Sequence, residues 1–113
     1  MKVAFAADSD RGLDAKIADR FARAPYIVIV EVSENWAVKE VKTISNPGVS
    51  ASGGAAARVA QLLSNENVRV AVGPSFGPNA EAILSQMGIK TVIVQPGITV
   101  NEALERVREQ LEK

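Results

Sequence analysis

The stretch Val68–Ala80, which reads VRVAVGPSFGPNA, constrains the possible fold more than any other part of the chain. An apolar run typical of a buried strand leads directly into a turn rich in glycine and proline, and the turn opens a helix. Gly73 and Gly77 allow the backbone to take a positive φ or to approach a ligand closely. Pro78 suits the first position of a helix because its φ is fixed and it lacks an N–H group. Since helix starts carry free N–H groups and partial positive charge, the turn is either a tight connection or a seat for an anionic ligand.

Other apolar runs predict the remaining strands. Besides Val68–Val72, the predicted strands are Lys2–Ala7, Tyr26–Val32, Trp36–Ile44 and Ile89–Val94. The first is almost continuously apolar, which is typical of a strand covered on both faces. The next two form an antiparallel hairpin, because turn residues separate them and the second alternates between apolar and polar residues. The segment Ala15–Ala24 is ambiguous, because the spacing of Ile17 and Phe21 suits one helical face but Pro25 ends any helix at about Ala24.

Three helices are predicted between and after these strands. The run AAARVAQLLS that follows Gly54 places its apolar side chains on one helical face. The second helix is predicted over Pro78–Met87, with Gly88 in the place of a C-terminal cap. Thr99 and Glu102 form a capping-box pattern at the start of the last helix. The order of elements is therefore strand, hairpin, helix, strand, helix, strand, helix.

This order predicts a single α/β domain with a mixed five-stranded sheet of order 3-2-1-4-5 and helices on both faces. Right-handed crossovers place the last two strands parallel to the first, with the hairpin on the opposite side. Ligands of such sheets bind where neighbouring connections leave in opposite directions, here between the first and fourth strands. We expect the loops Asp8–Leu13 and Gly73–Asn79 to meet there, with Gln95–Gly97 beside them.

The composition excludes several classes of function. The chain of 113 residues contains no cysteine and no histidine, so thiolate nucleophiles, disulfides and thiolate or imidazole metal ligands are absent, and a metal could rest only on carboxylates, backbone groups or the two methionines. Its 13 basic and 13 acidic residues balance, which gives no bulk electrostatic reason to bind nucleic acid or an anionic membrane. No apolar run approaches membrane-spanning length, and the first strand begins too early to leave room for a signal peptide. We expect a cytoplasmic protein that is not an enzyme.

Two groups of charged residues could contact a ligand. Arg20 and Arg23 suit planar anions, but paired arginines near an acidic residue such as Asp19 more often form surface ion pairs, and this is the favoured interpretation. A second group, formed by Asp8, Asp10 and Asp14, crowds the first turn. It fails the calcium-loop pattern, because the sixth position is not glycine and the twelfth is not glutamate. Turn-forming aspartates account for this group, and no metal site is predicted.

Two glycine-rich helix starts are the other candidates for ligand binding. They are Ser50–Gly54 and Gly73–Asn79, and neither matches a phosphate loop or the GxGxxG pattern. Both expose backbone beside a helix start, and the second adds the hydroxyl of Ser75 and the amide of Asn79. The simpler explanation of Ser50 and Ser52 is helix capping.

Four runs together resemble the dinitrogenase iron–molybdenum cofactor biosynthesis family, namely RFARAPYIVIVEV, NPG at 46–48, GGAAARVAQLL and VAVGPSFGPNAEAIL. The resemblance implies a ribonuclease H-like motif, in agreement with the predicted topology. It also implies binding or carrying of an iron–sulfur cluster or an iron–molybdenum cofactor precursor, without catalysis. The family's positions in this chain would be Arg20, Phe21, Arg23, Pro25, Asn46, Gly53, Gly54, Gly77, Pro78 and Asn79. Members often place histidine or cysteine before the double glycine, where this chain has Val49-Ser50-Ala51-Ser52, and Ala22 replaces the usual glycine.

The resulting hypothesis is a non-catalytic binding or carrier module for an anionic metallocluster or a related small anionic ligand. Backbone amides and arginines, or outside ligands, would hold such a cluster because soft protein ligands are missing. The predicted ligand-binding residues are Arg20, Arg23, Gly53, Gly54, Gly73, Ser75, Gly77 and Asn79. One alternative is a regulatory or interaction domain that binds a small anionic metabolite or a partner protein without a cluster. A third hypothesis is a nuclease that binds a metal through Asp8 and Asp10, and it rests on these residues and on fold analogy alone.

Overall fold

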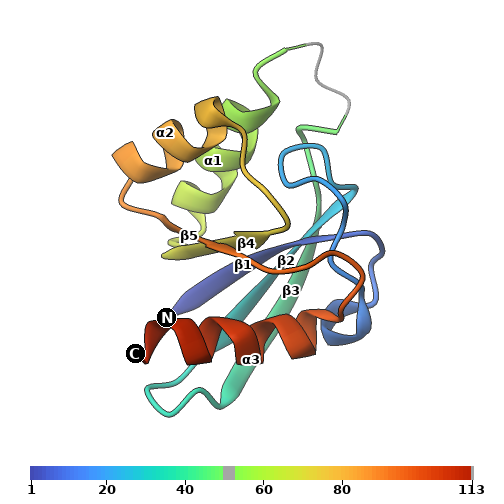
Figure 1. The fold of residues 1–113 in the computed structure, drawn as a ribbon, viewed down its shortest axis with the longest axis vertical. Helices are drawn as coiled ribbons and strands as arrows, with labels where there is room; N and C mark the ends of the chain where they lie inside the picture. Colours follow the sequence, from blue (N-terminus) through green and yellow to red (C-terminus); the bar gives the residue numbers. More distant parts are fainter. Residues whose placement is uncertain (50–52, 113) are drawn as a thin grey trace.

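The computed structural model describes residues 1–49 and 53–112 and contains the predicted mixed sheet (Figure 1). Its strand order is β3-β2-β1-β4-β5, so the predicted order is confirmed. The central strand β1 pairs antiparallel with β2 and parallel with β4, as the crossover rule requires. The strands are β1 (Lys2–Ala7), β2 (Tyr26–Val32), β3 (Val38–Ser45), β4 (Val70–Gly73) and β5 (Lys90–Ile93).

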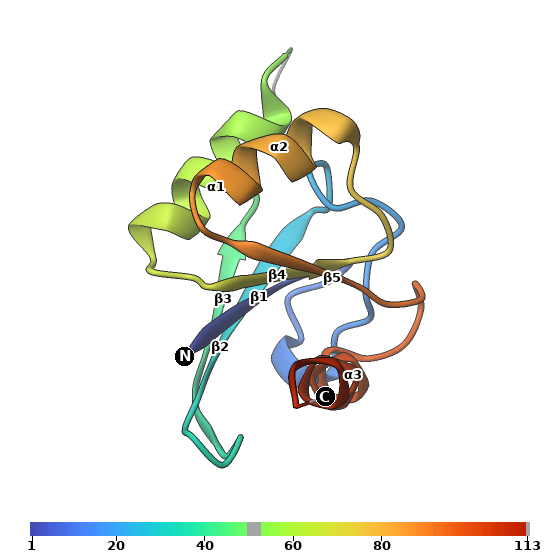
Figure 2. The same ribbon diagram turned by 60° about the vertical axis from the view of Figure 1, so that its left-hand side comes forward.

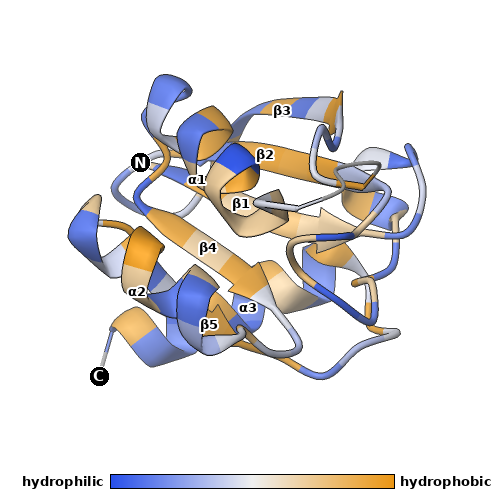
Figure 3. Cartoon of the chain, turned by 90° about the horizontal axis from the view of Figure 1, so that it is seen from above, coloured by the Kyte–Doolittle hydropathy of each residue, from blue (hydrophilic) through white to orange (hydrophobic). Residues whose placement is uncertain are grey.

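Helices cover both faces of the sheet. The helices α1 (Ala55–Asn65) and α2 (Pro78–Gln86) lie side by side on one face, and α3 (Val100–Leu111) lies on the other (Figures 1 and 2). Successive residues of β1 point to opposite faces, so Ala4 enters the core under α1 and α2 while Phe5 enters the core under α3. Both are fully buried. Burial of both faces explains why β1 is apolar after Lys2, within a sheet whose central strands are largely hydrophobic (Figure 3). Within the described residues, no helix is long and apolar enough to span a membrane.

The hairpin differs from the prediction at the start of its second strand. The strand begins at Val38 rather than at Trp36, because Trp36 has φ +67° and lies in the turn. The amide of Ala37 donates to Ser33 Oγ, which closes the turn. The pairing register of β2 with β3 shifts just before this turn, between Glu31 and Val32. Trp36 instead packs, half-buried, against the core on the α3 side. The Trp36 side chain therefore contributes to core packing and not to the strand.

The ambiguous segment after β1 forms no α-helix. A short 3-10 turn at Gly12–Asp14 comes first, and Ile17 then pairs with Ala7 through an isolated bridge. The amide of Ala18 donates to Ala6 O at 3.0 Å, so residues 18–25 cross the carboxyl end of β1. This corrects the expected crevice: Leu13 packs into the core on the α3 side, and residues 18–25 occupy the place predicted for the first loop.

The last helix begins with the predicted capping box. Thr99 Oγ1 accepts from the amide of Glu102 at 3.1 Å, and Glu102 Oε1 accepts from the amide of Thr99 at 3.2 Å. Replacing Thr99 by alanine is expected to lower the free energy of unfolding by about 1 kcal/mol, because one helix-start amide loses its acceptor. Urea denaturation measures this change, and Thr99→Ser should remain close to wild type because it keeps the hydroxyl. An equal loss in both variants would contradict the capping role.

Candidate functional site

Two arginines and the turn after β4 border one surface hollow at the carboxyl ends of β1 and β4. It measures about 390 Å³, and we call it the arginine hollow. Its lining residues are Arg20, Phe21, Ala22, Arg23, Ser75, Gly77 and Ala80. The structure thus brings together four of the predicted site residues from two segments some fifty positions apart, namely Arg20, Arg23, Ser75 and Gly77. In the described part of the chain, Arg20 makes no ion pair with Asp19, so the expected surface pairing does not account for it.

Phe21 anchors residues 20–25, which we call the arginine segment, to the sheet. Its side chain is only 3% exposed, and its ring centroid lies 4.7 Å from that of Phe76 at an interplanar angle of 47°. Gly73 lies directly beneath it, because a Cβ added there would come within 3.3 Å of the Phe21 side chain. The close approach predicted for Gly73 is therefore made by Phe21, and Gly73 is not among the lining residues of the arginine hollow. An apolar residue between two exposed arginines was the sequence signal for this anchor.

Asn46 fixes the backbone on both sides of Arg23. It is 2% exposed, and its Nδ2 donates to Ala22 O at 3.0 Å and to Ala24 O at 2.8 Å. Its Oδ1 accepts from the amide of Gly48 at 2.8 Å. Arg23 Nη1 donates to Gly48 O at 3.3 Å, which joins the guanidinium to the same turn. In the sequence, Asn46 stands out only as one of the family positions, and no pattern predicts its contacts.

Two further hollows adjoin the site. One, of about 260 Å³, shares Arg20 and Arg23 but is also lined by the carboxylates of Asp8 and Asp19. The other, of about 280 Å³, lies between the first turns of α1 and α2 and is lined by Gly54 and Asn79. These two predicted residues are thus near each other but outside the arginine hollow. Gly53 is exposed and lines none of the three hollows, and the predicted caps Ser50 and Ser52 lie outside the described residues.

Among residues 1–49 and 53–112, no side chain caps the start of α1 or of α2. Gly54 precedes α1 with φ +68°, and Gly77 precedes α2 with φ −64° and Pro78 after it. No side chain accepts from the first amides of either helix in the described structure. These amides and the positive end of the helix dipole are therefore available to an anion at the mouth of each hollow.

The chemistry of the donors limits what the site can hold. No group of three or more acidic, histidine or cysteine side chains among residues 1–49 and 53–112 could hold a metal ion. A metal cluster would therefore receive no thiolate or imidazole ligand from this chain. It could receive hydrogen bonds and charge from guanidinium groups, amides and the Ser75 hydroxyl, which suits an anionic cluster with its own sulfide ligands.

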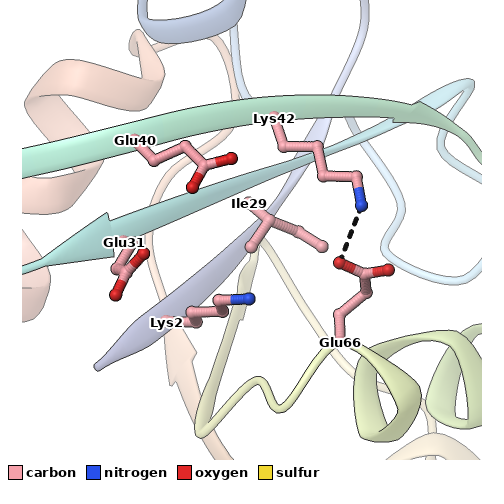
Figure 4. A pocket seen from close by; sticks show the side chains of 6 residues that line it. All are labelled: Lys2, Ile29, Glu31, Glu40, Lys42 and Glu66. Carbon is pink, nitrogen blue, oxygen red and sulfur yellow. Dashed lines mark hydrogen bonds and ion pairs between the residues drawn. The ribbon is translucent and has the colours of Figure 1, made fainter.

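A charged cluster at the opposite end of the sheet is structural (Figure 4). Lys42 Nζ lies 3.0 Å from Glu66 Oε1, which ties β3 to the end of α1. The hollow beside this ion pair measures about 10 Å³, room for about one water molecule. It is too small for a cofactor, and an ion pair this exposed contributes little stability.

The fold and the arginine hollow define an α/β domain that presents cationic side chains at the carboxyl ends of its central strands. Its sequence matches the family described as dinitrogenase iron-molybdenum cofactor over residues 1–110. The protein therefore belongs to this family. No curated protein matches the sequence.

Solved structures show the same fold. The apo form of the orange protein from Desulfovibrio gigas superposes with a TM-score of 0.84 at 29% identity, covering 96% of this chain and 88% of that one. A putative NifB protein from Thermotoga, of the DUF35 family, gives a TM-score of 0.76 at 29% identity, covering 96% and 87%. The crystal structure of PH0822 gives 0.80 at 20% identity, covering 97% and 92%, and this likeness concerns the fold alone.

Proposed function

We propose that this protein is a non-catalytic carrier that binds an anionic metallocluster, an iron–sulfur or iron–molybdenum cofactor precursor, in the arginine hollow. The observation that carries the proposal is the convergence of Arg20 and Arg23 on a hollow of about 390 Å³ beside the uncapped start of α2. Because the chain as a whole is neutral, this convergence gives a local preference for anions that net charge does not. Membership of the cofactor family supports the nature of the cargo.

The hollow combines an apolar surface with polar donors. Phe21, Ala22 and Ala80 contribute carbon atoms, while Ser75 and the two arginines contribute O–H and N–H groups. A sulfide-bridged cluster has a polarisable surface and net negative charge, so it suits such a mixture better than a small hydrated anion does. Binding through charge and hydrogen bonds without a covalent ligand also leaves the cargo free to be handed on.

Anaerobic reconstitution tests the proposal directly. The protein is incubated with iron and sulfide, or with isolated iron–molybdenum cofactor, and then freed of unbound material by gel filtration. A carrier is expected to elute with a charge-transfer absorption band and a raised melting temperature. A colourless protein with an unchanged melting temperature would contradict the proposal. It would favour the alternative in which the hollow binds a small anionic metabolite or a partner protein.

The double variant Arg20→Gln/Arg23→Gln is expected to bind isolated iron–molybdenum cofactor at least about tenfold more weakly, because two charge-assisted donors are lost. Titration followed by absorbance measures the affinity. The matched control is Arg69→Gln/Arg106→Gln, which removes two exposed arginines that line none of the three hollows. Added salt should weaken wild-type binding and have a smaller effect on the first double variant. Equal losses in both double variants would show a general charge effect and contradict the site.

A further inference from the structure

We infer that Asn46 is a positioning residue for the arginine hollow: its buried side-chain amide holds the backbone that presents Arg23 to the hollow beside Arg20. This inference rests on the proposed function, because binding of the cluster is what the positioned arginines would serve. Its starting point is that Asn46 is the buried polar residue of the described core. All of its side-chain hydrogen bonds go to main-chain atoms of the arginine segment or of its own turn.

The hydrogen bonds of Asn46 flank Arg23 on both sides. Its Nδ2 binds the carbonyls of Ala22 and Ala24, so the peptide groups before and after Arg23 are both fixed. The main-chain N–H of Asn46 also donates to Pro25 O at 3.1 Å. One residue thus satisfies three carbonyls within four positions of the arginine segment.

The backbone of the segment is not held by regular secondary structure. Residues 20–25 form neither a helix nor a strand, and Ala24 N to Phe21 O, at 3.3 Å, is their one internal backbone hydrogen bond in the described structure. Packing of Phe21 and of Ala24 fixes the segment on either side of Arg23, but packing of an alanine does not fix the direction of its peptide groups. The orientation of the peptide groups before and after Arg23 therefore depends on Asn46. Without it, two carbonyls would have to turn toward water, and the backbone that carries Arg23 would turn with them.

The turn that holds Asn46 reaches the guanidinium as well. The Asn46 Oδ1 bond to the amide of Gly48 fixes the turn, and Gly48 O in turn accepts from Arg23 Nη1. The same asparagine therefore orients the Arg23 main chain directly and its side chain through Gly48. This arrangement reduces the conformational freedom that the arginine would otherwise lose on binding the cluster.

The test compares two Asn46 variants with a control variant whose substitution lies on the α3 face of the sheet. Asn46→Ala removes all three side-chain hydrogen bonds, and Asn46→Asp keeps the shape and the acceptor for Gly48 but loses both donors. The control, Leu104→Ala, truncates a buried residue of α3 on the far side of the sheet. Because the control lowers global stability without touching the arginine segment, it separates a positioning effect from a loss of stability. If Asn46→Ala fails to fold, Asn46→Ser takes its place.

Two measurements decide the outcome. Backbone ¹⁵N relaxation without ligand should show the order parameters of residues 20–24 falling from about 0.85 toward about 0.6 in the Asn46 variants alone. Affinity for isolated iron–molybdenum cofactor should fall about tenfold in the same variants and stay unchanged in Leu104→Ala. Unchanged order parameters, or lost order with unchanged affinity, would overturn the inference. If the wild type binds no cofactor, the proposed function fails, and a selective fall in order parameters still supports the hold of Asn46 on the segment.

Discussion

Replacing Phe21 by alanine is expected to lower the free energy of unfolding by about 3 to 5 kcal/mol, one of the two largest effects expected at this site. Phe21 is 3% exposed, packs against Phe76 and fills the space above Gly73. Truncation removes this packing and leaves a cavity between the arginine segment and β4, which the sheet beneath cannot close. Urea denaturation at constant m-value measures the change.

The partner ring provides the control for this prediction. Phe76 is half-buried, so Phe76→Ala is expected to cost clearly less than Phe21→Ala. The double variant should show a coupling of about 1 kcal/mol between the rings, as tilted aromatic pairs do. A cost below about 1 kcal/mol for Phe21→Ala would show that the arginine segment is not anchored by this ring.

The sheet could be predicted because its strands follow local rules. The strands Lys2–Ala7 and Tyr26–Val32 have the predicted bounds, since a strand covered on both faces is apolar at nearly every position. The strand order then follows from chain order and from the handedness of crossovers. The ends of the outer strands were less well defined. Trp36, for example, is apolar and β-prone, but its positive φ places it in the turn.

The arginine segment could not be predicted, because distant residues decide its conformation. The spacing of Ile17 and Phe21 suggested a helical face, yet Ile17 bonds through its amide to Ile98 O, some eighty positions away. Phe21 depends on the space that Gly73 leaves, and its neighbours depend on Asn46, more than twenty positions later. No periodic pattern encodes such contacts.

The candidate site was predicted as a set of residues but not as one surface. Arg20, Arg23, Ser75 and Gly77 do line one hollow, whereas Gly54 and Asn79 line another. The presence of a glycine in the sequence does not by itself tell which surface or contact that glycine serves. A glycine beside a helix start can line an open hollow, as Gly77 does, or give room to a neighbouring ring, as Gly73 does.

Replacing Gly48 by alanine is expected to lower the free energy of unfolding by about 3 kcal/mol, at the upper end of the usual cost of overpacking. A Cβ at this position would lie 2.6 Å from Ala22 O, 3.0 Å from Val59 Cγ2 and 3.1 Å from Ala55 O. Two of these atoms belong to the main chain, so no side-chain rotation relieves the overlap. Either the arginine segment or the start of α1 must move, and urea denaturation measures the cost.

The matched control is Gly77→Ala. Nothing lies within 4 Å of a Cβ built at Gly77, and its φ of −64° suits alanine, so stability should stay within about 1 kcal/mol of wild type. If Gly48→Ala moves the arginine segment rather than α1, its order parameters at residues 20–24 should change in the same way as those of the Asn46 variants. A Gly48→Ala protein as stable as Gly77→Ala would contradict the tight contact between the 46–48 turn and the arginine segment. That contact lets the Asn-Pro-Gly turn position the arginine segment, although the turn contributes none of the residues that line the arginine hollow.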